Sequence, residues 1–226
     1  MATRKTSQRT ALLAGATGLI GAGLLTLLRD SSVYKHTHVL LRRALPGLAA
    51  NARITPHVID FAQLPDPLPA VDDVFIALGT TIKVAGSQAA FRAVDFDAVL
   101  HFARAARRAG VRRFGVVSAL GASASSASFY NRVKGEMEAE LATLGFSSLV
   151  IARPSLLAGD RASLGQPQRL GERLALAVTA PFAAFIPVAW RPIQAARVAR
   201  ALLRAVAAGA PGVLLLESAA LQGLGT

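Results

Sequence analysis

Three glycines spaced three residues apart, in the run GATGLIG (15–21), constrain the fold of this chain more than any other feature. They are Gly15, Gly18 and Gly21, and they lie between an apolar stretch of strand length (10–15) and a stretch with a helical pattern. A phosphate binds to backbone N–H groups at a helix N-terminus, and this close approach requires residues with little or no side chain. A tightly packed helix start could show the same spacing, but at the head of a βαβ unit the run favours a dinucleotide-binding site.

Apolar stretches of strand length alternate with helical patterns along the whole chain. We expect strands at 10–15, 38–41, 54–59, 73–78, 113–119, 148–153 and 212–217, and helices at about 18–29, 88–109, 130–144, 166–179 and 194–208. Near-continuous apolar strands of this kind are buried on both faces, which is typical of a parallel sheet covered by helices on both sides. With 226 residues, the chain is long enough for one such α/β domain, and a second full domain would be cramped.

The composition excludes several kinds of site. The chain has no cysteine, so disulfides, thiolate metal sites and cysteine nucleophiles are excluded. Its four histidines show no metal-ligand spacing, so we expect no metal site. The formal net charge of +12 suits a polyanion or an anionic cofactor, but the arginines are scattered over helical stretches without interleaved aromatic residues. We therefore expect no specific nucleic-acid partner.

Two uncharged runs, 11–28 and 174–190, have about the length of a membrane-spanning helix. The first contains four glycines and the second is broken by Pro181 and Pro187, so we interpret both as parts of a soluble core or of a pocket lining. We expect no membrane span, and we expect a cytoplasmic protein.

The end of the second expected strand indicates which dinucleotide binds. An acidic residue there would hydrogen-bond the ribose 2′-hydroxyl of NAD, but the chain has Arg42 and Arg43, which can pair with the 2′-phosphate of NADP. NADP(H) is therefore the expected cofactor, although one of the two arginines could simply point into solvent. After the third strand, Asp60 and Phe61 could border the adenine, and Asp60 could equally be a helix N-cap.

The fourth expected strand ends in Gly79, Thr80 and Thr81. In an open parallel sheet, ligands lie outside the carboxyl ends of the strands, so we expect this turn to run along the cofactor. A plain turn is the alternative.

Ser118, Tyr130 and Lys134 are the candidate catalytic residues. Tyr130 and Lys134 are four residues apart on an expected helix, which places their Cβ atoms about 5 to 6 Å apart on one face. The ammonium group favours the phenolate electrostatically, so the phenol becomes a usable acid or base, and Ser118 at the end of the fifth strand supplies a second hydrogen bond to a substrate carbonyl. A Tyr-x-x-x-Lys pair alone is common on solvated helices, but together with the serine and the glycine run it favours catalysis.

The chain resembles the short-chain dehydrogenase/reductases, specifically the atypical, NAD(P)H-binding branch that contains the Tat-interactive protein and its bacterial relatives. The matching stretches are LLAGATGLIG, LRR, LGTTIKVAG, VVSALGAS, YNRVKGEMEAEL, ARPSLLAGDR and RPIQAARVARALL, which span nearly all of residues 10–208. The resemblance implies a Rossmann-like, doubly wound parallel sheet. It also implies a single NAD(P)-binding domain over 1–226, in which 155–226 contributes a small C-terminal substrate region.

The resemblance also implies roles for individual residues. Gly15, Thr17, Gly18, Leu19 and Ile20 would meet the pyrophosphate, Leu78, Gly79 and Thr80 would line the adenosine and ribose, and Pro154 would pass beside the nicotinamide. Ser118, Tyr130 and Lys134 match the catalytic triad of such proteins, and Lys134 would also hold the nicotinamide ribose. Many such sites have a fourth member, an asparagine on the preceding helix. None is evident here, although Asp97 lies in that region.

We therefore expect an NADP(H)-dependent oxidoreductase that acts on a small carbonyl or alcohol substrate. The substrate pocket is expected from about 155–192 and the loop 119–129, with Phe182, Phe185, Ile186 and Trp190 as apolar lining or ordinary core. The alternative is a regulatory protein that binds NADPH without turnover, because the asparagine is missing. Oligomeric state stays open between a monomer and a homodimer, the latter formed through helices 88–109 and 130–144.

Overall fold

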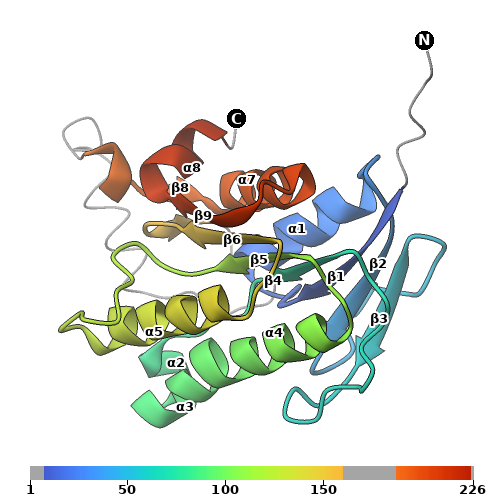
Figure 1. Cartoon of the computed structure of the whole chain (residues 1–226), viewed down its shortest axis with the longest axis horizontal. Helices are drawn as coiled ribbons and strands as arrows, with labels where there is room; N and C mark the ends of the chain where they lie inside the picture. Colours follow the sequence, from blue (N-terminus) through green and yellow to red (C-terminus); the bar gives the residue numbers. More distant parts are fainter. Residues whose placement is uncertain (1–7, 160–186, 225–226) are drawn as a thin grey trace.

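The computed structural model describes residues 8–159 and 187–224 of the chain. Seven parallel strands form its main sheet, in the order β3-β2-β1-β4-β5-β6-β9 (Figure 1). They are β1 (Arg9–Ala14), β2 (Tyr34–Leu41), β3 (Ile54–Val58), β4 (Asp73–Ile76), β5 (Arg113–Val117), β6 (Ser148–Arg153) and β9 (Gly212–Glu217). The strand order reverses between β1 and β4, so the expected Rossmann-like, doubly wound sheet is confirmed.

Helices cover both faces of this sheet. On one face lie α1 (Leu19–Arg29) and α7 (Ala195–Ala208), and on the other lie α3 (Gln88–Arg92), η1 (Ala93–Ala98), α4 (Val99–Arg108) and α5 (Phe129–Thr143) (Figure 1). The strands are apolar on both sides because each face meets a helix layer: Leu13 and Val39 are buried toward α1, while Leu12 and Ile76 are buried toward α4. Two apolar layers therefore enclose the sheet.

The expected helix at 88–109 contains a local irregularity. Residues Ala93–Ala98 form a π-helical turn between α3 and α4, and this turn packs against α5. Propensity and periodicity do not predict such a turn, but π-helical turns are frequent at functional sites.

The second strand begins at Tyr34, four residues before the expected start at residue 38. The polar residues Lys35 and His36 interrupt the apolar pattern near its beginning, so the pattern predicts a start that is too late. The short α2 (Ile82–Ala85) and α8 (Ser218–Leu224) were also not expected. The expected helix at 166–179 lies outside the described residues, as do Phe182, Phe185 and Ile186.

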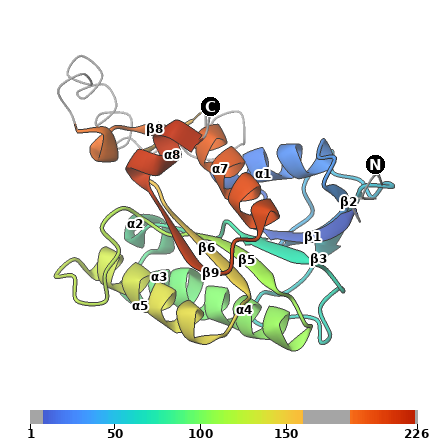
Figure 2. The same ribbon diagram turned by 45° about the horizontal axis from the view of Figure 1, so that its top comes forward.

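The C-terminal stretch contributes to the main sheet as well as to the substrate side. β9 pairs along its whole length with β6, and α7 lies beside α1 and crosses β5 and β6 (Figure 2). The helices come close because residue 23 is glycine: a Cβ atom there would lie 3.1 Å from the Cβ of Ala199. The short β7 (Leu157–Ala158) and β8 (Ile193–Gln194) form a separate two-stranded sheet, in which β8 contacts α7, and η4 (Val188–Trp190) contacts α8.

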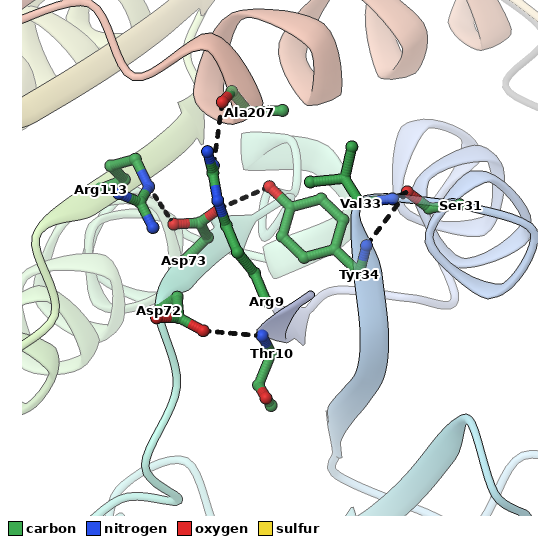
Figure 3. A network of polar contacts seen from close by, with 9 residues as sticks. All are labelled: Arg9, Thr10, Ser31, Val33, Tyr34, Asp72, Asp73, Arg113 and Ala207. Atoms are coloured by element: carbon green, nitrogen blue, oxygen red, sulfur yellow. Dashed lines mark hydrogen bonds and ion pairs between the residues drawn. The ribbon is translucent and has the colours of Figure 1, made fainter. Parts of the chain in front are cut away.

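Asp73 anchors a polar network at the amino end of β4 (Figure 3). This fully buried carboxylate accepts a 2.6 Å hydrogen bond from the Tyr34 hydroxyl and forms ion pairs with Arg9 and Arg113. Arg9 also donates to the carbonyl of Ala207 at the end of α7. Burial, followed by the charge of Asp73, raises the pKa of the Tyr34 phenol well above its usual range. The network ties four neighbouring strands and a helix together at the sheet edge formed by the amino ends of the strands.

No helix among the described residues is long and apolar enough to cross a membrane. The same part of the chain contains no cluster of three or more potential metal-ligating side chains.

Candidate functional site

Two adjoining cavities open at the carboxyl ends of the strands. One has a volume of about 990 Å³ and extends along the ends of β1 and β2, and the other has a volume of about 510 Å³ and lies at the ends of β5 and β6. Gly18 and the residues 77–80 that follow β4 line both. The pair therefore follows the point where the strand order reverses, which is where open α/β sheets bind dinucleotides.

In the loop between β1 and α1, two glycines are required because the protein's own backbone lies too close for a side chain. Gly15 has φ +92°, and a Cβ atom there would lie 2.5 Å from the backbone of Ala77. A Cβ at Gly21 would lie 1.9 Å from the carbonyl oxygen of Gly15. Gly21 lines neither cavity, so its role is to let α1 pack closely behind the loop.

Gly18 is different, because a Cβ placed there would make only ordinary contacts, 3.5 Å from the carbonyl oxygen of Gly15 and 3.9 Å from that of Ala77. It faces both cavities and is the N-cap of α1, whose first turn has no side-chain cap. The uncapped N–H groups are available to an anion, and the open space above Gly18 lets one approach. The expected neighbours Thr17, Leu19 and Ile20 line one or the other cavity.

The larger cavity contains the expected adenosine-side residues, with one exception. Arg42, Arg43 and Phe61 line it, and both arginines are exposed at the end of β2. Asp60 does not line it: the Asp60 carboxylate accepts a 2.9 Å hydrogen bond from the N–H of Ala62, which stabilises a local turn. The acid that does line this cavity is Asp97.

The smaller cavity brings together the expected catalytic residues. Ser118, Tyr130, Lys134 and Pro154 all line it, with Leu78, Gly79 and Thr80 at its boundary with the larger cavity. The Ser118 side chain is buried, and its hydroxyl oxygen has no hydrogen-bond partner. Buried hydroxyl groups nearly always have a partner, so an unpartnered one on a residue of the cavity lining is a candidate for contact with a ligand.

Lys134 is held by an acid that the sequence analysis did not single out. Its ammonium nitrogen lies 2.7 Å from a carboxylate oxygen of Asp95, and the side chains of the two residues are 3% and 0% exposed. The other oxygen of Asp95 accepts a 2.8 Å hydrogen bond from the N–H of Thr80. Burial by itself would lower the pKa of Lys134, but the charge of Asp95, the charge of Tyr130 and the hydrogen bond with Asp95 together outweigh it, so the pKa of Lys134 is raised.

Asp97, which occupies the region of the absent asparagine in the sequence, does not make this contact and lies on the larger cavity. Asp95 lies four residues after Phe91 and four before Val99, both of which are buried, so it falls on the buried face of the helical pattern. Asp97, two residues further on, lies on another face. This spacing is a signal in the sequence that could have identified Asp95 as the buried acid.

Tyr130 is positioned by packing. Its ring lies 5.2 Å, between centroids, from that of the fully buried Phe91, one helical turn before Asp95. Two residues of the helix that contains α3 and η1 thus face two residues of α5, Phe91 against Tyr130 and Asp95 against Lys134. Both residues of the Tyr-x-x-x-Lys pair are held from the same side.

Further contacts position the wall of the smaller cavity. Arg153, at the end of β6 and next to Pro154, donates to the buried carboxylate of Glu138 on α5 at 3.0 Å and to Glu217 on β9 at 2.8 Å. The loop after β5 packs closely on α5, since a Cβ at Gly135 would lie 2.1 Å from the backbone of Ser123. The chain on either side of the cavity is therefore tied to the helix that carries Tyr130 and Lys134.

The residues present fit a nicotinamide dinucleotide. An uncapped helix N-terminus, an open space above Gly18 and two arginines lie along one side, and an unpartnered buried hydroxyl lies at the other end. The sequence profile of a family described as NAD(P)H-binding matches residues 15–161.

The chain belongs to this NAD(P)H-binding family. Protein HTATIP2 of Rattus norvegicus is 33% identical to it over 98% of this chain and 91% of the relative. The mitochondrial protein FMP52 of Eremothecium gossypii is 39% identical over 67% of each chain. These matches confirm the resemblance inferred from the sequence motifs.

The names of the FMP52 relatives also overturn one expectation. Those of Eremothecium gossypii, Debaryomyces hansenii and Coccidioides immitis are all described as mitochondrial. The expectation of a cytoplasmic protein is therefore wrong, and nothing in the motifs themselves bears on the compartment.

Solved structures show the same fold. MoeE5 in complex with UDP-glucose and NAD matches with a TM-score of 0.69 at 20% identity, over 91% of this chain and 74% of that one. ADP-L-glycero-D-manno-heptose-6-epimerase of Helicobacter pylori matches with a TM-score of 0.69 at 16% identity, over 96% of this chain and 78% of that one. The oxidoreductase ylbE of Lactococcus lactis matches with a TM-score of 0.62 at 17% identity, over 95% and 96% of the two chains.

Proposed function

We propose that this member of the NAD(P)H-binding family is an NADP(H)-dependent oxidoreductase that transfers a hydride to or from a small carbonyl or alcohol substrate. The observation that carries the proposal is the hydroxyl of Ser118. It is buried, it lacks a partner, and it lines the same cavity as Tyr130 and Lys134. A substrate oxygen bound there would meet two hydroxyl groups, one to orient it and one to exchange a proton with it.

Each residue has a distinct part in this proposal. When bound, the nicotinamide supplies or accepts the hydride. Tyr130 donates its phenolic proton to the carbonyl oxygen as an alcohol forms, and in the reverse direction it accepts that proton. Ser118 donates a hydrogen bond that orients the same oxygen. Lys134 holds the nicotinamide ribose, and its positive charge stabilises the phenolate that Tyr130 becomes.

The preference for NADP(H) over NAD(H) rests on Arg42 and Arg43. They line the larger cavity at the end of β2, where the adenosine ribose is expected. No acid of β2 competes with them, because the strand ends in leucines before the arginines. A phosphate on the ribose would form charge-assisted hydrogen bonds with one or both guanidinium groups.

A second candidate is an NADPH-binding regulatory protein without turnover. The observation that favours it is the ion pair between Lys134 and Asp95, because a carboxylate 2.7 Å from the ammonium offsets the charge that Lys134 offers to Tyr130. In that case the cavities bind the cofactor and report its presence, and the Ser118 hydroxyl only contacts it.

The decisive experiment combines cofactor titration with a carbonyl screen. Wild type, Tyr130→Phe and Ser118→Ala are titrated with NADPH and NADH, and each is assayed for reduction of a panel of aldehydes and ketones. We expect NADPH binding in all three and a loss of kcat of about 100-fold or more in Tyr130→Phe. NADPH binding with no turnover by wild type would support the regulatory protein. Full activity of Tyr130→Phe would refute the assigned proton donor.

A further inference from the structure

Asp95 is buried without contact with solvent, and the fold exposes both of its carboxylate oxygens to polar groups of the site. One oxygen is paired with Lys134 at 2.7 Å, and the other accepts the N–H of Thr80 at 2.8 Å. Thr80 belongs to the turn after β4 that lines both cavities. A single side chain thus connects the expected cofactor turn with the expected catalytic lysine.

The close packing at this point depends on glycine at position 79. A Cβ atom there would lie 3.3 Å from the Asp95 carboxylate and 3.9 Å from the Lys134 nitrogen. The ion pair therefore lies close to the backbone of the turn. A side chain at position 79 would require the Asp95 carboxylate to shift by a few tenths of an ångström.

Lys134 has few other groups that could keep it charged. The groups facing it are Tyr130 and Glu138 on its own helix, Asp95 from η1 and the carbonyl of Val117 at 3.4 Å from β5. Glu138 is engaged by Arg153, so its charge is already balanced. Removing an ammonium from water costs several kcal/mol unless a partner compensates it, and a buried lysine without one becomes a neutral amine near neutral pH.

We propose that Asp95 is a positioning residue that keeps the buried Lys134 protonated and ties it to the cofactor turn through the Thr80 N–H. A neutral asparagine at position 95 could accept the same N–H, but it could not supply the charge. An acid is therefore needed at this position because the side chain of Lys134 is only 3% exposed. The protonation of Lys134 by itself does not depend on the proposed function. Its effect on catalysis rests on that function, since a neutral Lys134 could not stabilise the phenolate of Tyr130.

The test is a pH titration of lysine side chains by NMR. The chain has four lysines, Lys5, Lys35, Lys83 and Lys134, so ¹³Cε-labelled lysine gives a small set of signals. The signal lost in Lys134→Met is that of Lys134, and the exposed Lys35 and Lys83 are internal references. We expect Lys134 of wild type to lose its proton at a higher pH than these references, and Lys134 of Asp95→Asn to lose it at a pH lower by about one unit or more.

A matched control removes a carboxylate from the helix that carries Lys134 without touching the ion pair. Glu136→Gln does this, because Glu136 pairs with the surface residue Arg92. The Lys134 titration should not move in Glu136→Gln. If Lys134 of Asp95→Asn titrates together with or above Lys35 and Lys83, the proposal is wrong. A wild-type Lys134 that titrates below them also overturns it, even where Asp95→Asn does not fold.

Activity provides a separate readout. Where carbonyl reduction is observed, Asp95→Asn should lower kcat at neutral pH about ten-fold or more, and Glu136→Gln should leave it within about two-fold. An unchanged kcat in Asp95→Asn would also contradict the proposal. Absence of turnover in wild type would remove the proposed oxidoreductase function, while the lysine titration would still test Asp95 on its own.

Discussion

At the scale of single residues, the proposed preference for NADP(H) rests on the two arginines after β2. Arg42 and Arg43 are exposed, and they line the larger cavity. Replacing both with alanine should weaken NADPH binding about ten-fold or more and change NADH binding little, because only NADPH carries the 2′-phosphate. Fluorescence titrations of the double variant and of each single variant measure this.

Those single variants also show whether one arginine alone binds the phosphate. Arg29→Ala is the control, since it removes a surface arginine that pairs with the neighbouring Asp30 and does not line either cavity. Should the double variant bind NADPH as tightly as wild type, the arginines do not contact the phosphate.

At the scale of secondary-structure elements, Gly135 sets the distance between α5 and the loop that follows β5. A Cβ at this position would overlap the backbone at Ser123, which cannot move as a flexible side chain would. Gly135→Ala should lower the free energy of unfolding by about 1 to 3 kcal/mol and raise hydrogen exchange in residues 119–128.

The helical Gly223 offers a matched comparison, because a Cβ there would meet no atom within 4 Å. Gly223→Ala should leave both the stability and the exchange of the loop unchanged or slightly improved. Equal effects of the two substitutions would mean that the close approach at Gly135 does not hold the loop.

Two histidines form a pH-dependent contact between β2 and β3. His38 Nδ1 lies 2.9 Å from His57 Nε2, and one ring must be neutral for this hydrogen bond to form. Burial, followed by neighbouring histidine charges, lowers the pKa of both rings below their usual 6.5. The unfolded chain therefore binds protons more readily, so stability should be full above about pH 6.5 and fall as the pH drops below it.

Urea unfolding between pH 8 and pH 5 measures this loss of stability. His57→Asn should flatten part of the pH dependence, because it removes one titrating ring and the charge that it places beside His38. A loss of the same size in this variant would assign the acid sensitivity to other groups.

At the scale of the whole molecule, the amino ends of the strands stabilise the fold and the carboxyl ends form the cavities. The Asp73 network lies at the amino ends of the strands (Figure 3), and both cavities lie at the carboxyl ends. Asp73→Ala should lower the free energy of unfolding by about 3 to 5 kcal/mol, because it leaves two guanidinium groups and the Tyr34 hydroxyl without their buried partner. Urea unfolding measures this change.

The neighbouring Asp72 is the control for that substitution. It is exposed and accepts one N–H, that of Thr10, so Asp72→Ala should cost about 1 kcal/mol. Neither variant should alter NADPH affinity while it remains folded. A loss of affinity in folded Asp73→Ala would show that the two ends of the strands are coupled.

The sequence by itself determined the fold class, the family and most of the residues around the cavities. Positions 15 and 21 require glycine because backbone segments approach closely there within one βαβ unit. Parallel strands that are buried on both faces are nearly continuous apolar runs in the sequence. These features are local, so a linear pattern contains them. The same motifs also point to Ser118, Tyr130 and Lys134, whose shared cavity the structure describes.

Only the tertiary structure decided which acid accompanies Lys134 and which acid faces the adenosine side. Asp60 is used in a local turn, Asp97 lines the larger cavity and Asp95 meets the lysine. The spacing of Asp95 from the buried Phe91 and Val99 marks it as a residue of the buried helix face, but that it meets Lys134 there depends on the packing of this helix on α5. The ion pair between Lys134 and Asp95 joins residues 39 positions apart through burial, so its effect on charge exists only in the folded chain.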